Sequence, residues 1–247
     1  MNDIATRVAH NVNRVRERIA RAAEAVGRTA EDVLLVAVTK YGNVAEVEAV
    51  VAAACRTLGE SRPQALWEKV PQIAAAQITA AQITAPEVEW HLIGHLQRNK
   101  VRRTLPLVSL IHSVDSLRLL QAIDEAAADR GQPARVLLEV NISGDPEKHG
   151  WSVDALRHAV EGLADYRRVE VRGLMTMASR TGDEQVARAN FASLRALRDE
   201  LAADCPANVE LVELSMGMSR DFEAAIHEGA TIVRIGSALF EDLSGAV

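Results

Sequence analysis

A single lysine, Lys40, ends the otherwise apolar run "LLVAVTKYG". A run that is apolar at every position predicts a buried strand of a parallel sheet, because helices cover both faces of such a sheet. Lys40 would then lie at the carboxyl end of the strand, where parallel folds place their chemistry. An amine at that edge can attack a carbonyl carbon. A solvated lysine at a strand end is the alternative interpretation of this segment alone.

A second group of candidate residues lies in "ELSMGMSRDFEAAIHEGATIVRIGSALF". Gly217 predicts a turn, and Ser219 is placed to cap a helix over "RDFEAAI". The next strand, "TIVRI", ends at Gly236 and Ser237. In a (β/α)8 barrel, a phosphate commonly lies between the loops after the last two strands, where backbone N–H groups and hydroxyls can bind it. Two ordinary helix caps are the alternative.

Arg234 lies between these two turns in the predicted strand order. It shares strand parity with Ile232 and Gly236, so if Gly236 faces the barrel mouth, Arg234 lies deeper on the same interior side. A buried arginine needs a partner. An inward-facing Glu is one candidate, and a ring nitrogen of a ligand is the other.

The motif "WHLIGHLQRNK" holds two histidines, His91 and His95, four residues apart. That spacing can bind a metal on a helix, but Gly94 breaks the helix and no third ligand is evident in the sequence. We therefore expect no metal site. Lys148 and His149, in the loop "NISGDPEKHGW", are expected to lie on a solvated rim because Gly and Pro surround them.

The elements that would position these residues alternate along the chain. Apolar residues recur every three or four positions from Ile4 to Ala22, which predicts a leading amphipathic helix that ends near Gly27. After it, eight strand-like runs alternate with helical runs. The runs are "VLLVAVT", "CRTLGE", "VEWHLIG", "LIHSVDS", "ARVLLEVNIS", "VEVRGLMTM", "VELVELSMG" and "TIVRIGSAL". This order, over 247 residues without a linker, predicts an α/β fold: a single (β/α)8 TIM barrel, residues 1–247, with an extra N-terminal helix.

Bulk composition narrows the class of protein. The net charge of -6 and the aromatic content of 3% argue against a nucleic-acid-binding surface. No apolar segment predicts a signal peptide or a membrane span, and the two cysteines, Cys55 and Cys205, have no metal or redox spacing. We expect a cytoplasmic protein with reduced thiols. The tandem "AQITAAQITA", Ala76 to Ala85, is expected to lengthen a helix or loop without repeating a domain.

A lysine, a phosphate-binding turn and an arginine together fit one cofactor, pyridoxal 5'-phosphate, which has an aldehyde, a phosphate and a ring nitrogen. Lysine forms a Schiff base with the aldehyde. Arginine donates hydrogen bonds without releasing a proton, so it would leave the pyridine nitrogen uncharged and weaken the ring as an electron sink.

The chain resembles the pyridoxal phosphate homeostasis proteins, which are similar in fold to the amino-terminal barrel of alanine racemase. The resemblance rests on "VAVTK", "LGES", "WHLIGHLQRNK", "EKHG", "GLMTMA", "LSMGMSRDFEAAI" and "VRIGSALF". It implies that Lys40 forms the Schiff base and that Arg234 lies near the pyridine nitrogen. The residues implied around the phosphate are Met218, Ser219, Gly236 and Ser237, with Ser215 as a further candidate. Ser61 stands where the family commonly has an asparagine, so a contact usually made by an amide changes here.

The resemblance also implies a function. Family members are regarded as carriers or regulators of the cofactor pool rather than enzymes, which predicts a monomer that passes the cofactor to pyridoxal phosphate-dependent apoenzymes. The chain ends before the additional β-domain of the racemases, which supports this interpretation. A small amino-acid racemase that uses Lys40 as one base is the alternative, and a sugar-phosphate barrel enzyme is a third.

Overall fold

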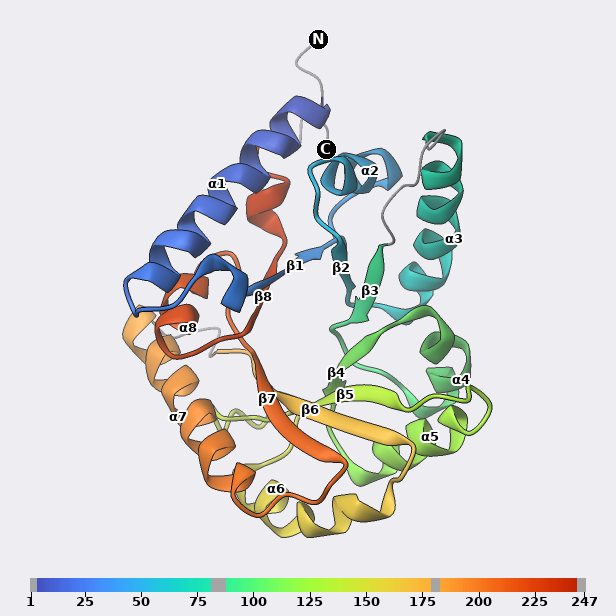
Figure 1. Ribbon diagram of the computed structural model, residues 1–247, viewed down its shortest axis with the longest axis vertical. Helices are drawn as coiled ribbons and strands as arrows, with labels where there is room; N and C mark the ends of the chain where they lie inside the picture. The colour runs from blue at the N-terminus through green and yellow to red at the C-terminus, as the bar shows by residue number, and fades with distance from the viewer. Residues whose placement is uncertain (1–3, 81–87, 179–182, 244–247) are drawn as a thin grey trace.

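The computed structural model describes residues 4–80, 88–178 and 183–243. Within these ranges, eight parallel strands close into a barrel in sequence order, and β1 pairs with β8 (Figure 1). The strands are β1 (Leu34–Val38), β2 (Thr57–Glu60), β3 (Glu89–Leu92), β4 (Leu110–Val114), β5 (Ala134–Glu139), β6 (Val169–Met175), β7 (Val209–Ser215) and β8 (Ile232–Ile235). Each strand falls within one of the predicted runs, so the predicted (β/α)8 barrel is confirmed.

Helices surround the barrel on its outside (Figure 1). They are α1 (Ile4–Glu24), α2 (Val44–Ala52), α3 (Pro63–Ala80), α4 (Val101–Thr104), α5 (Leu117–Ala127), α6 (Val153–Ala159), α7 (Glu184–Ala202) and α8 (Phe222–His227). Side-chain caps begin several of them. Asn43 caps α2 together with Glu46, Ser116 caps α5 and Ser152 caps α6. Asn43 and Ser116 follow their strands closely, whereas Ser152 ends the longer loop after β5, so each cap ends a loop at the carboxyl side of the barrel.

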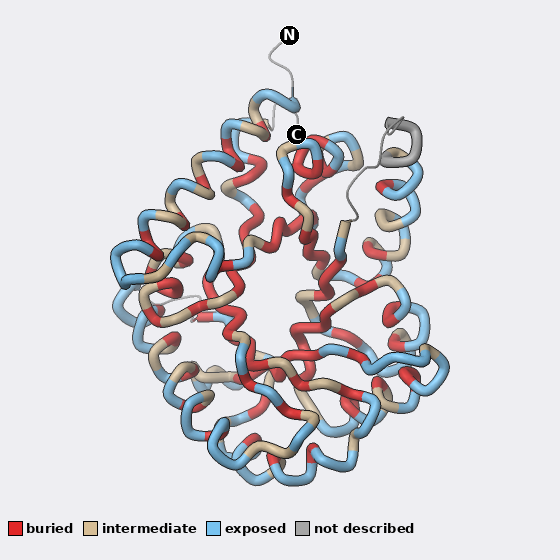
Figure 2. Tube along the Cα trace, viewed as in Figure 1, coloured by how far each residue is buried: buried red, intermediate tan, exposed pale blue. Residues whose placement is uncertain are grey.

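The core has two parts. A small cluster fills the inside of the barrel, and it consists of Val36, Leu110, Leu137, Met175 and Ile232. A much larger cluster lies between the strands and the helices. Figure 2 shows this arrangement, with buried residues along the strands and the inward faces of the helices, and exposed residues outside. Because adjacent residues on a strand face these two clusters in turn, the strands are apolar on both faces.

The leading helix α1 is the predicted extra N-terminal helix. Its buried residues include Val8, Val12, Val15 and Ile19, the positions that the periodicity indicates, and it packs against α2 and α8. Buried Asn11 donates hydrogen bonds from Nδ2 to backbone carbonyls near the other end of the chain: to Leu239 at 3.2 Å and to Glu241 at 2.9 Å. The helix therefore joins the two ends of the barrel sequence.

Three further expectations concern the periphery. The first copy of the tandem repeat lies in α3, and the second copy falls outside the described residues. Both cysteines are free, with Cys55 buried and Cys205 half-buried. Among the described residues, no helix has the length and apolar character that a membrane crossing requires.

Candidate functional site

Lys40 lies two residues beyond Val38, the last residue of β1, and its side chain is exposed. Its Nζ atom lies 4.7 Å from the centre of the Tyr41 ring, within the range of a cation–π contact. Val36, which shares a strand face with Lys40, belongs to the cluster inside the barrel. Lys40 therefore extends the interior face of β1 to the carboxyl edge of the sheet, as the alternation predicts.

A buried ion pair supports the turn that carries Lys40. Glu60, the last residue of β2, is fully buried, and its Oε2 accepts hydrogen bonds from Lys69 at 2.9 Å and from Thr39 at 3.0 Å. Lys69 also donates to the Thr39 carbonyl at 2.6 Å. Burial alone would raise the pKa of Glu60, but the hydrogen bonds and charge of Lys69, with those of Ser61 and Thr39, lower it. The ionised pair thus fixes the residue that precedes Lys40.

Ser61 directly follows β2. Its backbone N–H donates to Oε1 of Glu60 at 2.7 Å, and its hydroxyl lies 3.4 Å from the same oxygen. The loop after β3 packs closely against this turn, because a Cβ on Gly94 would lie 2.2 Å from the Ser61 carbonyl oxygen. Ser61 therefore binds back to Glu60.

Arg234 is buried inside the barrel, with 4% of its surface exposed. It pairs in register with Val36 of β1, and its guanidinium donates to the Ser215 hydroxyl at 2.6 Å and the Thr176 carbonyl at 2.9 Å. The interior position follows the predicted parity. Within the described residues, Arg234 donates its hydrogen bonds to these two neutral oxygens. A hydrogen bond to an inward-facing Glu, one of the two predicted partners, is not found there. Burial lowers the pKa of Arg234 to about 10, so it remains a cation at neutral pH.

Two buried histidines continue the hydrogen bonds of Arg234. His112 lies 2.9 Å from the Ser215 hydroxyl through Nδ1 and 3.0 Å from His91 through Nε2. Arg234 can only donate, so Ser215 accepts from it and donates its own hydroxyl hydrogen bond to Nδ1 of His112. Nδ1 is therefore unprotonated, and the ring proton of His112 lies on Nε2. Burial lowers the pKa of His91 to about 4 and the pKa of His112 well below its ordinary value, so both rings are neutral. His112 was not among the candidates predicted from the sequence, although it shares strand parity with inward-facing Leu110.

The turns after β7 and β8 meet through the Ser219 hydroxyl. Its oxygen accepts hydrogen bonds from the backbone N–H groups of Gly236 and Ala238, both at 3.3 Å. Ser237 lies between these two donors and is exposed, and Met218 is also exposed. Backbone N–H groups that converge on one oxygen are the donors that an anion requires.

The helix cap in this region differs from the sequence prediction. Asp221, rather than Ser219, is the residue before α8, and its Oδ1 accepts the Met218 N–H at 2.6 Å. Gly217 makes the tight turn possible, because its φ is +90° and a Cβ there would lie 2.9 Å from the Cα of Phe222. The prediction that Ser219 caps the helix was wrong, since the turn takes two more residues before the helix begins.

The turn after β8 lies against the turn after β1. A Cβ on Gly236 would lie 3.3 Å from Cβ of Val38 and 3.6 Å from the ring of Tyr41. The Lys40 amine, the N–H groups of the β8 turn and the guanidinium of Arg234 therefore come from adjacent strands. An amine binds an aldehyde, converging N–H groups bind a phosphate, and a guanidinium binds a basic ring nitrogen. The donor set fits a ligand that carries all three groups.

Other residues from the sequence analysis lie elsewhere. His91 and His95 do not form a pair, because His91 faces the barrel interior and His95 is exposed beyond β3. Lys148 lies on the loop after β5, where its Nζ donates to the Ser143 hydroxyl at 3.1 Å and the Ala178 carbonyl at 2.9 Å. These contacts attach the loop to the segment after β6.

Comparison with known proteins gives consistent matches. Residues 6–244 match the family model described as alanine racemase, N-terminal domain. A pyridoxal phosphate homeostasis protein of Pseudomonas aeruginosa is 37% identical over 94% of this chain and 94% of its own length. A crystal structure of an unknown protein from Bifidobacterium adolescentis has a TM-score of 0.89 and 39% identity, over 97% of each chain. PipY of Synechococcus elongatus with PLP bound has a TM-score of 0.76 and 32% identity, over 92% of this chain and 100% of PipY.

Proposed function

Because the chain belongs to the family of pyridoxal phosphate homeostasis proteins, within the alanine racemase N-terminal domain family, we propose that it binds pyridoxal 5'-phosphate and acts in the homeostasis of this cofactor. One structural observation carries the proposal. The β8 turn, whose N–H groups of Gly236 and Ala238 converge on one oxygen, lies against the β1 turn that carries Lys40. Residues 1–247 act as one cofactor-binding domain.

Each residue of this site has one role in binding. Lys40 would hold the aldehyde carbon through its amine, and its exposed position keeps that amine accessible. Gly236, Ser237 and Ser219 bind the phosphate together with the Met218 segment. Met218 contributes its backbone and exposed side chain to the wall of this site.

Arg234 would bind the pyridine nitrogen from the barrel interior, where the guanidinium lies. Pyridoxal phosphate, when protonated on its ring, supplies an electron sink for carbanion chemistry. Arg234 has no acceptor atom and retains its proton, so it leaves the ring nitrogen uncharged. Ser215 accepts from Arg234 at 2.6 Å, and we assign it to the orientation of that guanidinium. Ser61 orients the turn after β2.

We propose that the protein is a carrier without substantial catalysis. Racemisation needs two proton-transfer groups on opposite faces of the ligand. Lys40 can serve one face. Tyr41 lies on the side of Lys40, and Tyr166 precedes β6, at the opposite end of the barrel. An amino-acid racemase is the second candidate, and the exposed amine of Lys40, which can serve as one base, is the observation in its favour.

The exposed Lys40 also suits transfer of the cofactor. An acceptor lysine of a pyridoxal phosphate-dependent apoenzyme can approach an adduct at the surface, so delivery needs no unfolding of the barrel. We propose that the protein works in the cytoplasm as a monomer.

Two experiments test this function. Purified protein should show the visible absorbance of a bound pyridoxal Schiff base, and borohydride should abolish it and leave a pyridoxyl group on the peptide that contains Lys40. Incubation of the loaded protein with L-alanine in deuterated water should give only trace exchange at Cα and trace D-alanine. Rapid exchange with inversion, lost in Lys40→Ala, would favour the racemase instead.

A further inference from the structure

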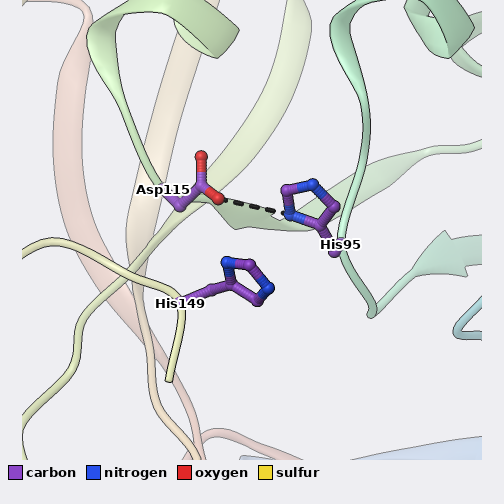
Figure 3. A group of neighbouring side chains, drawn as sticks. All are labelled: His95, Asp115 and His149. Atoms are coloured by element: carbon purple, nitrogen blue, oxygen red, sulfur yellow. Dashed lines mark ion pairs between the residues drawn. The ribbon is translucent and has the colours of Figure 1, made fainter. Parts of the chain in front are cut away.

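Three residues that the cofactor site does not use come together on another side of the barrel mouth (Figure 3). His95 follows β3, Asp115 follows β4 and His149 follows β5. One potential ligand atom from each residue lies within 4.8 Å of the others. Of the two histidines in the motif, His95 alone joins this group, and the structure supplies two further ligands from neighbouring loops.

The distances approach those of a metal site. Nδ1 of His95 lies 3.3 Å from Oδ2 of Asp115. Two ligands on a tetrahedral zinc ion, with bonds of about 2.0 to 2.1 Å, are separated by about 3.3 Å. The His149 ring stacks on His95, with centroids 4.5 Å apart and an angle of 20° between the rings. Both histidines are exposed, so side-chain rotation can bring a nitrogen of His149 onto the same ion.

The backbone around these residues is held by specific contacts. Oδ1 of Asp115 accepts the Ser116 hydroxyl at 3.0 Å, which leaves Oδ2 toward His95. Trp151, two residues after His149, donates from its ring nitrogen to the Val114 carbonyl at 3.0 Å in a buried bond. That bond fastens the β5 loop to the residue that precedes Asp115. Outer contacts of this kind fix the orientation of metal ligands.

The open side of the group has room for further ligands. His95 and Asp115 line a cavity of about 610 Å³, together with Arg98 and Arg118. The side chain of His95 is 43% exposed and that of Asp115 is 14% exposed, so water reaches both ligand atoms. Three protein ligands with an open position are the arrangement of a catalytic-type zinc site, in which water occupies the fourth position.

We propose that His95, Asp115 and His149 form a binding site for Zn²⁺, with water as the fourth ligand. Two imidazoles and a carboxylate suit zinc better than magnesium or calcium, which bind through oxygen. The site is separate from the Lys40 site in its residues and strands, so it stands or fails independently of the proposed function.

Zinc titration of the untagged full-length protein by isothermal calorimetry tests the site. We expect one Zn²⁺ per chain. His95→Ala, His149→Ala and Asp115→Asn should each weaken binding by at least about 100-fold, since even outer-shell partners of metal ligands contribute about 10- to 100-fold. His158→Ala is the matched control, because His158 is an exposed histidine on α6 outside the group, and it should bind zinc as the unsubstituted protein does.

A second measurement avoids substitutions. Zinc should protect His95 and His149 of the unsubstituted protein from diethylpyrocarbonate, as read by mass spectrometry of the peptides, while His158 stays reactive. Absence of saturable binding, equal affinity in His149→Ala and His158→Ala, or equal modification of His95 and His149 with and without zinc would each overturn the proposal.

Discussion

This barrel contains two pairs of neighbouring histidines, and the two pairs differ in whether their ring nitrogens are buried or accessible. In the inner pair, His91 and His112 are buried, with ring centroids 5.0 Å apart and a 3.0 Å hydrogen bond. In the outer pair, His95 and His149 are exposed and stacked at 4.5 Å beside Asp115. One histidine of each pair comes from the same short motif. Burial, rather than residue type or spacing, therefore determines whether a histidine of this motif is accessible to a ligand.

The inner pair belongs to a line of buried groups that bind one another. It runs from His91 through His112 and Ser215 to Arg234, and each contact in it is a hydrogen bond of 3.0 Å or less. Such groups contribute to stability and orientation, because their donors and acceptors already have partners. The rim residues, Lys40 among them, remain accessible to ligands. Four predictions test this contrast.

The largest effect is expected at the rim. Lys40→Ala should abolish the covalent cofactor adduct completely while the free energy of unfolding stays within about 0.5 kcal/mol, because the side chain is exposed. Borohydride reduction with peptide mass spectrometry measures the adduct, and urea denaturation measures stability. Lys100→Ala, a lysine near α4, is the control and should keep the adduct. A pyridoxyl group fixed on another lysine of the Lys40→Ala variant, at the level of the unsubstituted protein, would show that the assignment is wrong.

The inner and outer pairs can be compared directly by His112→Ala and His149→Ala. His112→Ala should lower the free energy of unfolding by about 3 to 5 kcal/mol, because it leaves a cavity and removes a partner of Ser215. His149→Ala should change it by less than about 0.5 kcal/mol. Urea denaturation of both variants gives the comparison, and equal losses would contradict the distinction between buried line and rim.

The two turns proposed to bind the phosphate, after β7 and β8, combine a half-buried and an exposed residue, since Ser219 is half-buried and Ser237 is exposed. Replacing both by Ala should weaken cofactor binding by about 2 to 4 kcal/mol, at about 1.5 to 3 kcal/mol for each charge-assisted hydrogen bond with some compensation by backbone donors. Equilibrium titration with pyridoxal phosphate measures the loss. Ser193→Ala, an exposed serine on α7, is the control. Unchanged affinity in the double variant would move the phosphate site elsewhere.

The most gradual effect is a pH dependence of stability. The pKa of His91 is about 4 in the folded protein because of burial, below its ordinary value of 6.5, so the unfolded chain takes up the proton first. Above pH 6.5, His91 does not lower the free energy of unfolding. As the pH falls from 6.5 toward 4, His91 lowers the free energy of unfolding by up to about 1.4 kcal/mol per pH unit. Urea denaturation between these limits should show a shallower loss in His91→Gln.

The comparison with the variant is needed because other groups titrate in the same range. Burial raises the pKa of Glu139 and of Asp221. Protonation of these carboxyl groups therefore makes the folded protein more stable as the pH falls. They are present in both proteins, as is His112, whose pKa burial also lowers, so the difference between the two slopes measures His91 together with its effect on His112. Equal slopes would mean that His91 is not neutral inside the barrel.

Much of the fold follows from local patterns. The two-residue period of strands places Lys40 at the carboxyl edge and Arg234 inside the barrel, and the helical period of α1 identifies its buried face. These features depend on neighbours within a few positions, so one sequence is enough to predict them.

Contacts between distant strands could not be predicted in this way. The hydrogen bond between His112 and Ser215 joins residues 103 positions apart, and the pair of Glu60 and Lys69 depends on how α3 packs on β2. Asp115 joins His95 only because β3 and β4 are neighbours in the closed barrel. The cap at Asp221 required the true length of a turn, which residue propensities do not specify.

The pairing of β1 with β8 has a consequence for the order of folding. Lys40 follows the first strand, whereas Arg234 lies in the last strand and Gly236 directly follows it, so the proposed cofactor site forms only when the ring of strands closes. A growing chain cannot assemble the site until nearly all of it has left the ribosome, and closure over so long a sequence separation is slow. Capture of pyridoxal phosphate at the proposed site would therefore report completion of the barrel, and a cofactor bound there would hold the first and last strands together.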